Sequence, residues 1–258
     1  MIASIHPASF VEDGAQLGTG VTIGPGAVVG ANVRIGDGSI IGSHALVTGW
    51  TTIGKACRLH HGAVAGSAPQ DIKYAGEPSY LEIGDHTELR EYVTANLGTE
   101  PGSTTRIGRH CLLMAYAHVA HNCQIGDHTI VANVVQFAGY VTVEDWAILG
   151  GGTLVHQFVR IGRHSIVGGA SRVVQDVAPF MTVAGAPPRC TGLNRVGLER
   201  RGFSDATRAA LDRCHRILFR DGMTAAGAVA LMREQFPGMP EVEALARFAE
   251  TSARGLTR

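Results

Sequence analysis

The sequence predicts an all-β solenoid of short parallel strands, a β-helix, followed by a C-terminal α-helical domain. Three observations predict it: an aliphatic residue recurs every six positions, a glycine often follows it, and this repeat stops near residue 173. Glycine is abundant at 34 residues, whereas aromatic residues make up only 6% of the chain. That composition favours many tight turns, and a hydrophobic content of 45% is that of a folded protein.

The six-residue repeat keeps a single phase from Ile5 to Val173. A period of six excludes an α-helix, which needs about 3.6 residues per turn, and excludes simple strand alternation with period two. It fits short strands with one turn in each hexad, so three hexads close a triangular coil of roughly 18 residues that stacks on the next coil. The aliphatic residue and a small residue two positions before it should point inward. The glycine should relieve backbone strain at the turn.

The aliphatic series is interrupted twice. The interruptions are at Ala65, Asp71, Glu77, Ala95 and Pro101. We expect loop excursions near residues 65–82 and 95–106 between intact coils. Long excursions from a rigid scaffold are often functional, although an ordinary surface loop is an equally good interpretation of the first one.

The solenoid is predicted to span residues 1–189, because the Pro-rich segment 177–189 follows the last repeat. Residues 190–258 are predicted to form the helical domain, which we expect to cap the end of the solenoid. Ser204 is suited to cap a helix that ends near Arg220.

Two further helices are predicted after this first one. Thr224 is suited to cap the second, and Pro240 suits the first turn of the third.

Charge and cysteine content exclude several classes of protein. The chain has 22 basic and 22 acidic residues, which gives no basic excess for nucleic acid. Five cysteines without a CxxC motif indicate reduced thiols, and therefore a cytoplasmic protein. The first residues do not resemble an export signal, and no apolar run has the length of a membrane span.

The segment AYAHVAHNC, residues 115–123, is the strongest candidate for chemistry. Val119 should point inward, so His118 and His121 should point outward. Stacking should place Gly139 one coil beyond His121 and Gln157 two coils beyond. A polar column with a glycine at its centre suits a cleft wall, and a hydrated edge is the alternative. We interpret the remaining outward histidines as surface residues, namely His44, His60, His61, His86, His110, His128 and His164.

Several motifs together resemble the family of UDP-N-acetylglucosamine 3-O-acyltransferases. They are QDIKYAGEP, AHVAHNC, GGTLVHQF, IVGGASRV and GLNRVGLERRGF, and the resemblance covers essentially the whole chain. It implies a left-handed parallel β-helix and a homotrimer with clefts between neighbouring solenoids. It also implies transfer of an acyl chain from acyl carrier protein to the 3-position of UDP-N-acetylglucosamine, the first step of lipid A biosynthesis. No metal or cofactor is implied, and the phosphopantetheine thioester of the carrier is the co-substrate.

The resemblance also implies roles for individual residues. His121 would be the general base, a task that suits imidazole at neutral pH, and the Gly139 N–H would stabilise the oxyanion. Asp71 and Lys73 would contact the sugar and the reacting region. The residues that would bind the nucleotide sugar are His118, His156, Gln157, Asn194 and Arg200. Gly169 would limit the length of the acyl chain.

This chain departs from the family pattern at four positions. Asn122 stands where relatives commonly carry Asp, and Tyr140 replaces a His one coil beyond it. Asn96 and Leu97 stand where relatives often carry His and Arg.

Features of the outer surface give weaker indications of partners. Apolar residues at positions that we expect to face outward agree weakly with a trimer; they are Val28, Val134, Val135 and Phe137. Arg216 and Arg220 are candidates to meet the acidic carrier protein, although a solvated helix face is at least as good an interpretation.

Three other functions remain open from the residues alone. A related β-helix enzyme could transfer an N-acyl or an acetyl group to another acceptor, in the latter case from acetyl-CoA. His118 and His121 could belong to a zinc enzyme that resembles γ-class carbonic anhydrase. The solenoid could also be a binding scaffold without catalysis.

Overall fold

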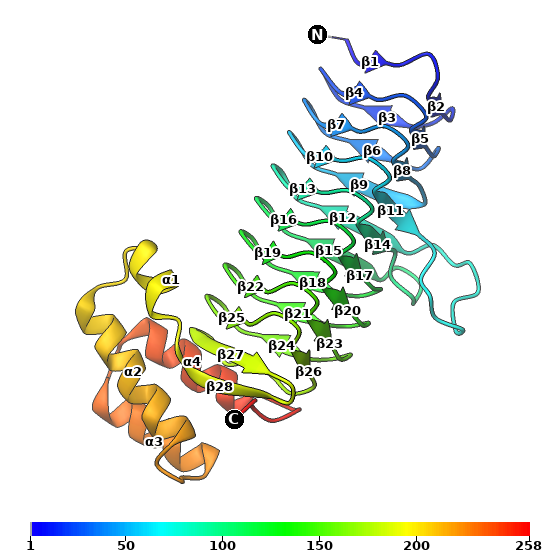
Figure 1. Ribbon diagram of the computed structural model, residues 1–258. Helices are drawn as coiled ribbons and strands as arrows, with labels where there is room; N and C mark the ends of the chain where they lie inside the picture. Colours follow the sequence, from blue (N-terminus) through cyan, green and yellow to red (C-terminus); the bar gives the residue numbers. More distant parts are fainter. Residues whose placement is uncertain (1) are drawn as a thin grey trace.

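The computed structural model describes residues 2–258, which form a triangular solenoid with a helical domain at one end (Figure 1). Three sheets make its sides. The first sheet comprises β1 (Ser4–Ile5), β4 (Thr22–Ile23), β7 (Ile40–Ile41), β10 (Arg58–Leu59), β13 (Glu88–Leu89), β16 (Leu112–Leu113), β19 (Ile130–Val131), β22 (Ile148–Leu149), β25 (Ile166–Val167), β27 (Met181–Gly185) and β28 (Pro188–Leu193). The second comprises β2 (Phe10–Val11), β5 (Val28–Val29), β8 (Leu46–Val47), β11 (Val64–Ser67), β14 (Thr94–Asn96), β17 (His118–Val119), β20 (Gln136–Phe137), β23 (Leu154–Val155) and β26 (Arg172–Val173). The third comprises β3 (Gln16–Leu17), β6 (Arg34–Ile35), β9 (Trp50–Ile53), β12 (Tyr80–Ile83), β15 (Thr104–Ile107), β18 (Gln124–Ile125), β21 (Thr142–Val143) and β24 (Arg160–Ile161).

The register confirms the predicted stacking of coils. Ile130 pairs in parallel with Ile148, and Val119 pairs with Phe137. Inward aliphatic residues and the small residues before them form one continuous core, as Leu149 and Ala147 illustrate with 0% exposure each. Val135 and Phe137, which we expected on the outer face, belong to this core at 0% and 1% exposure. Their alternation places them on the inner face, so our expectation for these two residues was wrong.

The two excursions lie between β11 and β12 and between β14 and β15. They occupy residues 68–79 and 97–103. Ala65 and Ala95, at which the aliphatic series breaks, pair with each other in the second sheet and are fully buried. The strands therefore extend further into both breaks than the aliphatic series indicates, because alanine fills the same inward position.

The glycine after each aliphatic residue is required for a reason other than the one we predicted. A Cβ on Gly126 would lie 2.5 Å from Asp145 Oδ1 in the next coil, so close stacking excludes a side chain there. The left-handed backbone conformation falls two residues later, at His128, with φ of 58°. In this turn the positive φ therefore falls on a non-glycine residue and Gly126 allows the coils to approach, whereas other turns have glycine at the positive-φ position, as Gly20 and Gly38 illustrate.

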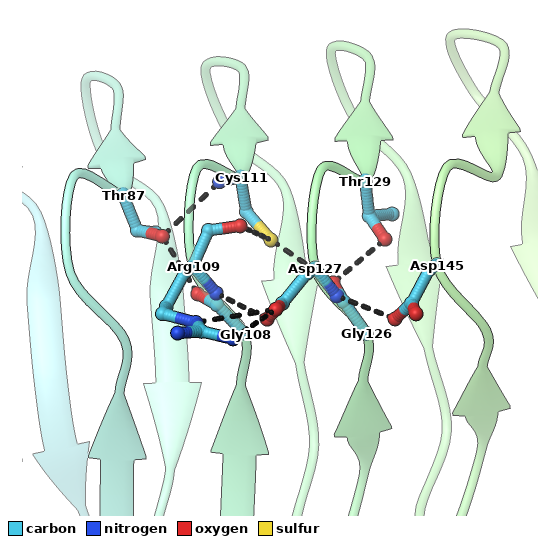
Figure 2. Close-up of polar contacts among 8 residues, drawn as sticks. All are labelled: Thr87, Gly108, Arg109, Cys111, Gly126, Asp127, Thr129 and Asp145. Atoms are coloured by element: carbon cyan, nitrogen blue, oxygen red, sulfur yellow. Dashed lines mark hydrogen bonds and ion pairs between the residues drawn. The ribbon is translucent and has the colours of Figure 1, made fainter.

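Side chains join successive coils at this corner (Figure 2). The Arg109 N–H donates to Asp127 Oδ1 at 2.8 Å, and the Asp127 N–H donates to Asp145 Oδ1 at 2.9 Å. Inside the turn, Thr87 Oγ1 donates to the Gly108 carbonyl at 2.7 Å. These bonds satisfy backbone groups that the short strands leave unpaired.

Aromatic rings stack along the same corner at the positions with positive φ. The ring centroids of His86 and His110 are 4.8 Å apart, and those of His110 and His128 are 4.9 Å apart. Trp146 continues the column at 4.0 Å from His128. We define this column, from His86 to His164, as the ring ladder. Several of the histidines interpreted as surface residues therefore have a packing role.

The end of the solenoid passes into a hairpin and four helices. β27 pairs in parallel with β25, and β28 then pairs antiparallel with β27. The predicted domain boundary at residue 189 therefore falls inside β28. The helices are α1 (Arg195–Arg200), α2 (Asp205–Phe219), α3 (Ala225–Gln235) and α4 (Pro240–Glu250).

The two predicted caps, and the predicted first-turn proline of a third helix, are confirmed. Ser204 and Thr224 accept the Thr207 and Gly227 N–H groups, respectively, and Pro240 begins α4. The sequence did not predict the short helix α1.

The last residues of the chain return to the solenoid. Buried Asp176 accepts a hydrogen bond from Ser252 Oγ at 2.7 Å, and Arg254 Nε donates to the Val174 carbonyl at 3.0 Å. The helical domain is thus bonded to the final coil, as the capping prediction requires. All five cysteines are free and buried. Within residues 2–258, the longest and most apolar helices fall short of what a membrane crossing requires.

Candidate functional site

A groove of about 440 Å³ runs along the outside of the second sheet. It crosses β17, β20 and β23, and His118, His121, Gly139 and His156 contribute to its wall. A larger groove of about 630 Å³ lies along the third sheet, but no histidine or cysteine lines it. The histidine motif is therefore located in a hollow, as its stacking with Gly139 predicts.

His121 projects into this groove because it follows β17, whose Val119 points into the core. Its side chain is only 14% exposed. Nδ1 lies 3.0 Å from Asn122 Oδ1, and Nε2 lies 3.8 Å from Asp71 Oδ2 in the first excursion. The Tyr140 ring stands at 90° to the imidazole, with 5.3 Å between centroids. The imidazole is thus held on several sides.

Gly139 lies directly beneath this imidazole. A Cβ at residue 139 would lie 2.5 Å from His121 Cε1 and 2.6 Å from Nε2, so only glycine leaves room for the ring. Its N–H has no hydrogen-bond acceptor within the part of the chain that the structure describes. A backbone donor without a partner beside a basic nitrogen is the arrangement that an oxyanion requires.

His118 is the first residue of β17 and lines the groove together with His121. Its Nδ1 is 2.7 Å from Thr94 Oγ1 in the preceding coil. Burial lowers the pKa of His118, and the nearby His121 lowers it further. His118 is therefore neutral at neutral pH and able to hydrogen-bond a polar ligand without carrying a charge.

Of three further candidates from the sequence, one lines the groove and two, Gln157 and Lys73, do not. His156 lines the groove and is exposed, and its Nδ1 donates to the Gln157 carbonyl at 3.2 Å. Gln157 is exposed but does not line the groove. Lys73 is an exposed residue of the first excursion whose N–H donates to Asp71 Oδ1 at 3.0 Å.

Asn194 and Arg200 do not reach this groove within one chain. Asn194 is 2% exposed and caps α1, because its Oδ1 accepts the Gly197 N–H and its Nδ2 donates to the His164 carbonyl. Arg200 is exposed at the end of α1, which lies beside the first sheet, away from the excursions (Figure 1).

Gly169 lies on an exposed column with Asn133 and Gly151. A Cβ on Gly169 would lie 3.1 Å from the Gly151 carbonyl oxygen, which is a tight contact, so a side chain here would fill the surface of the column. The surface is without side chains at Gly151 and Gly169, the last two positions of this column.

Sequence reasoning missed three polar residues that line the groove, Gln70, Gln136 and Arg172. The pairing of His118 with Gln136, and of Leu154 with Arg172, puts two of them in one column of the second sheet. Counting one coil onward from His118 would have found Gln136. Gln70 belongs to the first excursion, where the repeat gives no register.

The four residues that depart from the family pattern all lie at or beside the second excursion. Asn96 and Leu97 are each 3% exposed, and Asn96 Nδ2 donates to the Ala68 carbonyl at 3.2 Å. Asn122 and Tyr140 both contact Glu100 of the second excursion. Throughout residues 2–258, no group of three His, Cys, Asp or Glu side chains is arranged to hold a metal ion.

Comparison with known proteins agrees with the fold and with the location of the repeat. Residues 176–257 match the family described as UDP-N-acetylglucosamine O-acyltransferase, domain 2. Three segments match the bacterial transferase hexapeptide (six repeats): 3–36 and 14–49, which overlap, and 104–135.

Two curated relatives align over the full length. The chain is 47% identical over 258 residues to acyl-[acyl-carrier-protein]--UDP-N-acetylglucosamine O-acyltransferase of Thiobacillus denitrificans, with 100% of both chains covered. It is 49% identical over 262 residues to the protein of the same name from Verminephrobacter eiseniae, again with 100% of both chains covered. The solved structure of LpxA from Acinetobacter baumannii superposes with a TM-score of 0.96 at 37% identity, covering 98% of this chain and 99% of that one. The left-handed parallel β-helix with a C-terminal helical region is thereby confirmed.

Proposed function

Because this chain belongs to the family of UDP-N-acetylglucosamine O-acyltransferases, we propose that it transfers an acyl chain from acyl carrier protein to the 3-position of UDP-N-acetylglucosamine. This reaction would be the first step of lipid A biosynthesis, carried out in the cytoplasm. The thioester of the carrier's phosphopantetheine would be the acyl donor, with no metal or other cofactor.

The single observation that carries this proposal is the juxtaposition of His121 with Gly139. His121 Nε2 would take the proton from the 3-hydroxyl as that oxygen attacks the thioester carbonyl. The carbonyl oxygen would then become negative, and the unpartnered Gly139 N–H would stabilise it. The carrier's thiolate leaves, and the proton held by His121 neutralises it.

The groove supplies groups that suit a sugar. Neutral His118 and exposed His156 line it on either side of His121 and would hydrogen-bond sugar hydroxyls or the N-acetyl group. Asp71 lies next to Nε2, so it would orient the acceptor hydroxyl, with Lys73 of the same excursion contacting the reacting region. Gln157, which is exposed beyond the groove, would bind a more distant part of the nucleotide sugar.

The diphosphate and the uridine would be bound between subunits of a homotrimer. Arg200 does not line the groove of its own chain, because α1, which carries it, lies beside the first sheet, so a neighbouring solenoid would bring Arg200 to the phosphates (Figure 1). Asn194 is buried as a helix cap, and it would act by holding α1, which carries Arg200. Exposed Val134, Leu154 and Phe158 give this face an apolar character that suits a subunit contact.

The acyl chain would follow the bare column at Gly151 and Gly169, where a larger side chain at residue 169 would shorten the accepted chain. The test is a mass-spectrometric assay of UDP-N-acetylglucosamine acylation with acyl carrier protein thioesters of increasing length, with acetyl-CoA as the competing donor. We expect product from carrier thioesters and none from acetyl-CoA. Equal turnover of acetyl-CoA, or activity that depends on stoichiometric zinc, would contradict the proposal.

A further inference from the structure

We propose that Glu100 is a positioning residue that fixes, through the side-chain amide of Asn122, which nitrogen of His121 carries the proton. This inference rests on the proposed function, because it concerns the general base of that reaction. It concerns a residue of the second excursion, outside the six-residue repeat.

Two contacts decide how the Asn122 amide is oriented. The Thr99 N–H donates to Asn122 Oδ1 at 3.0 Å, and Asn122 Nδ2 donates to Glu100 Oε2 at 3.0 Å. A backbone N–H can only donate, and an ionised carboxylate can only accept. The opposite orientation of the amide would place donor against donor at Thr99 and acceptor against acceptor at Glu100. Both neighbours therefore select the same orientation.

The orientation of the amide then decides the tautomer of the imidazole. Asn122 Oδ1 faces His121 Nδ1 at 3.0 Å, and an amide oxygen carries no proton to donate. Nδ1 must therefore carry the hydrogen, which leaves the lone pair on Nε2, beside Gly139 and Asp71. A reversed amide would present its NH₂ group to Nδ1 and favour a proton on Nε2, and that tautomer could not accept the substrate's proton.

Tyr140 keeps Glu100 in the form and place that this role requires. The Tyr140 hydroxyl donates to the other carboxylate oxygen of Glu100. This hydrogen bond lowers the pKa of Glu100. Burial is the main reason that the pKa of Tyr140 is raised to about 12, and the hydrogen bond to Glu100 and the negative charge of Glu100 add to it. At neutral pH Glu100 is thus an ionised acceptor and Tyr140 a protonated donor.

The first test removes the acceptor. Glu100→Ala should lower kcat about tenfold, the scale of one hydrogen bond to a charged group. KM for the sugar nucleotide should stay within about twofold, because the affected proton moves only in the transition state. Glu100→Gln retains an acceptor oxygen and should recover most of kcat. Glu234→Ala is the matched control, because Glu234 is an exposed glutamate of α3.

The second test replaces the Asn122 amide, which has two possible orientations, with a carboxylate, in which both orientations are equivalent. In Asn122→Asp both side-chain oxygens accept, so the His121 tautomer no longer depends on Glu100. The new carboxylate faces that of Glu100 and the two repel each other, so adding Glu100→Ala to that variant should not lower kcat, whereas a further tenfold loss is expected if Glu100 serves only the loop. A tenfold loss that persists in the Asn122→Asp background overturns the proposal.

Nitrogen NMR of His121 gives a readout without substrate. We expect the Nδ1–H tautomer in the wild-type protein and a mixture of tautomers in Glu100→Ala. An unchanged tautomer in Glu100→Ala would overturn the positioning role even if His121 proved essential. Full activity of His121→Ala would instead contradict the proposed function, so the two failures are distinguishable.

Discussion

Two corners of the solenoid, at His121 and at Asp127, place side chains with different roles at the same position of the turn. His121 and Asp127 each lie two residues after an inward aliphatic residue, and each precedes a residue with positive φ, Asn122 at 60° and His128 at 58°. Asp127 accepts the N–H of Arg109 from the preceding coil. His121 instead projects over Gly139 of the next coil. The same turn therefore links two coils where it carries an aspartate, Asp127. It forms a candidate active site where it carries a histidine, His121, whose imidazole lies over a glycine of the next coil.

Replacing the imidazole should produce the largest effect. His121→Ala should lower kcat at least ~10²-fold, the usual scale for loss of a general base. His121→Asp, which converts this corner to the structural type, should be equally inactive and remain folded. The carrier-dependent acylation assay measures both, and His6→Ala in the first coil is the control. Wild-type turnover in His121→Ala would show that this corner is also structural.

Filling the space beneath the ring should have the next largest effect. Gly139→Ala places a Cβ 2.5 Å from His121 Cε1, so the ring must move away from its position above the Gly139 N–H. We expect kcat to fall about 10- to 100-fold, near the lower range for a disturbed oxyanion donor. Gly30→Ala is the matched control, since its nearest neighbour would be 3.4 Å away. Equal activity of the two variants would contradict the steric role of residue 139.

The structural corner should respond in stability and not in activity. Asp127→Ala loses the Arg109 N–H bond at 2.8 Å and the guanidinium contact at 2.9 Å. With this carboxylate partly exposed, we expect the free energy of unfolding to fall by about 1 kcal/mol. Chemical denaturation measures this change, with exposed Asp13→Ala as the control.

The pH dependence of that variant checks the cause. Burial alone would raise the pKa of Asp127, but the hydrogen bonds from Arg109 and its charge outweigh burial and lower it. A lowered folded-state pKa means that the stabilisation is fully present above the ordinary carboxyl pKa of about 3.9 and is lost as pH falls below it. The difference between wild type and Asp127→Ala should therefore shrink in acid; a constant difference would contradict the ionic explanation.

The ring ladder should give the smallest effect at neutral pH, because its contribution to stability changes only in mild acid. Burial is the main reason that the pKa of His164 is lowered to about 4, and the positive charges of Arg201 and Arg163 add to it. The negative charge of Asp145 acts in the opposite direction. The unfolded chain binds a proton near pH 6.5 and the folded chain does not, so stability falls as pH drops from about 6.5 to 4. His164→Phe, which keeps the ring beside Phe180, should flatten this slope in thermal denaturation. A slope equal to that of wild type would assign the acid sensitivity to another group.

The sequence predicted the repeating part of the molecule well, because each hexad gives the same information many times. Val119, His121 and Gly139 could be placed by counting alone. The excursions carry no such register, so counting could not reveal that Gln70 lines the groove or that Glu100 meets Asn122. Helix caps at Ser204 and Thr224 were visible because capping is local. The short helix α1 was missed, since its cap, Asn194, depends on the His164 carbonyl of a distant coil.

The two excursions are bonded to each other as well as to the solenoid. The Gly102 N–H donates to the Pro78 carbonyl at 2.8 Å, and Asn96 of β14 holds the start of the first excursion through the Ala68 carbonyl. Asp71 approaches His121 from one excursion, and Glu100 approaches Asn122 from the other. An engineer who transplants one loop from a sister enzyme would therefore misalign its companion. Exchange of specificity between such enzymes should succeed only when both loops are grafted as a pair.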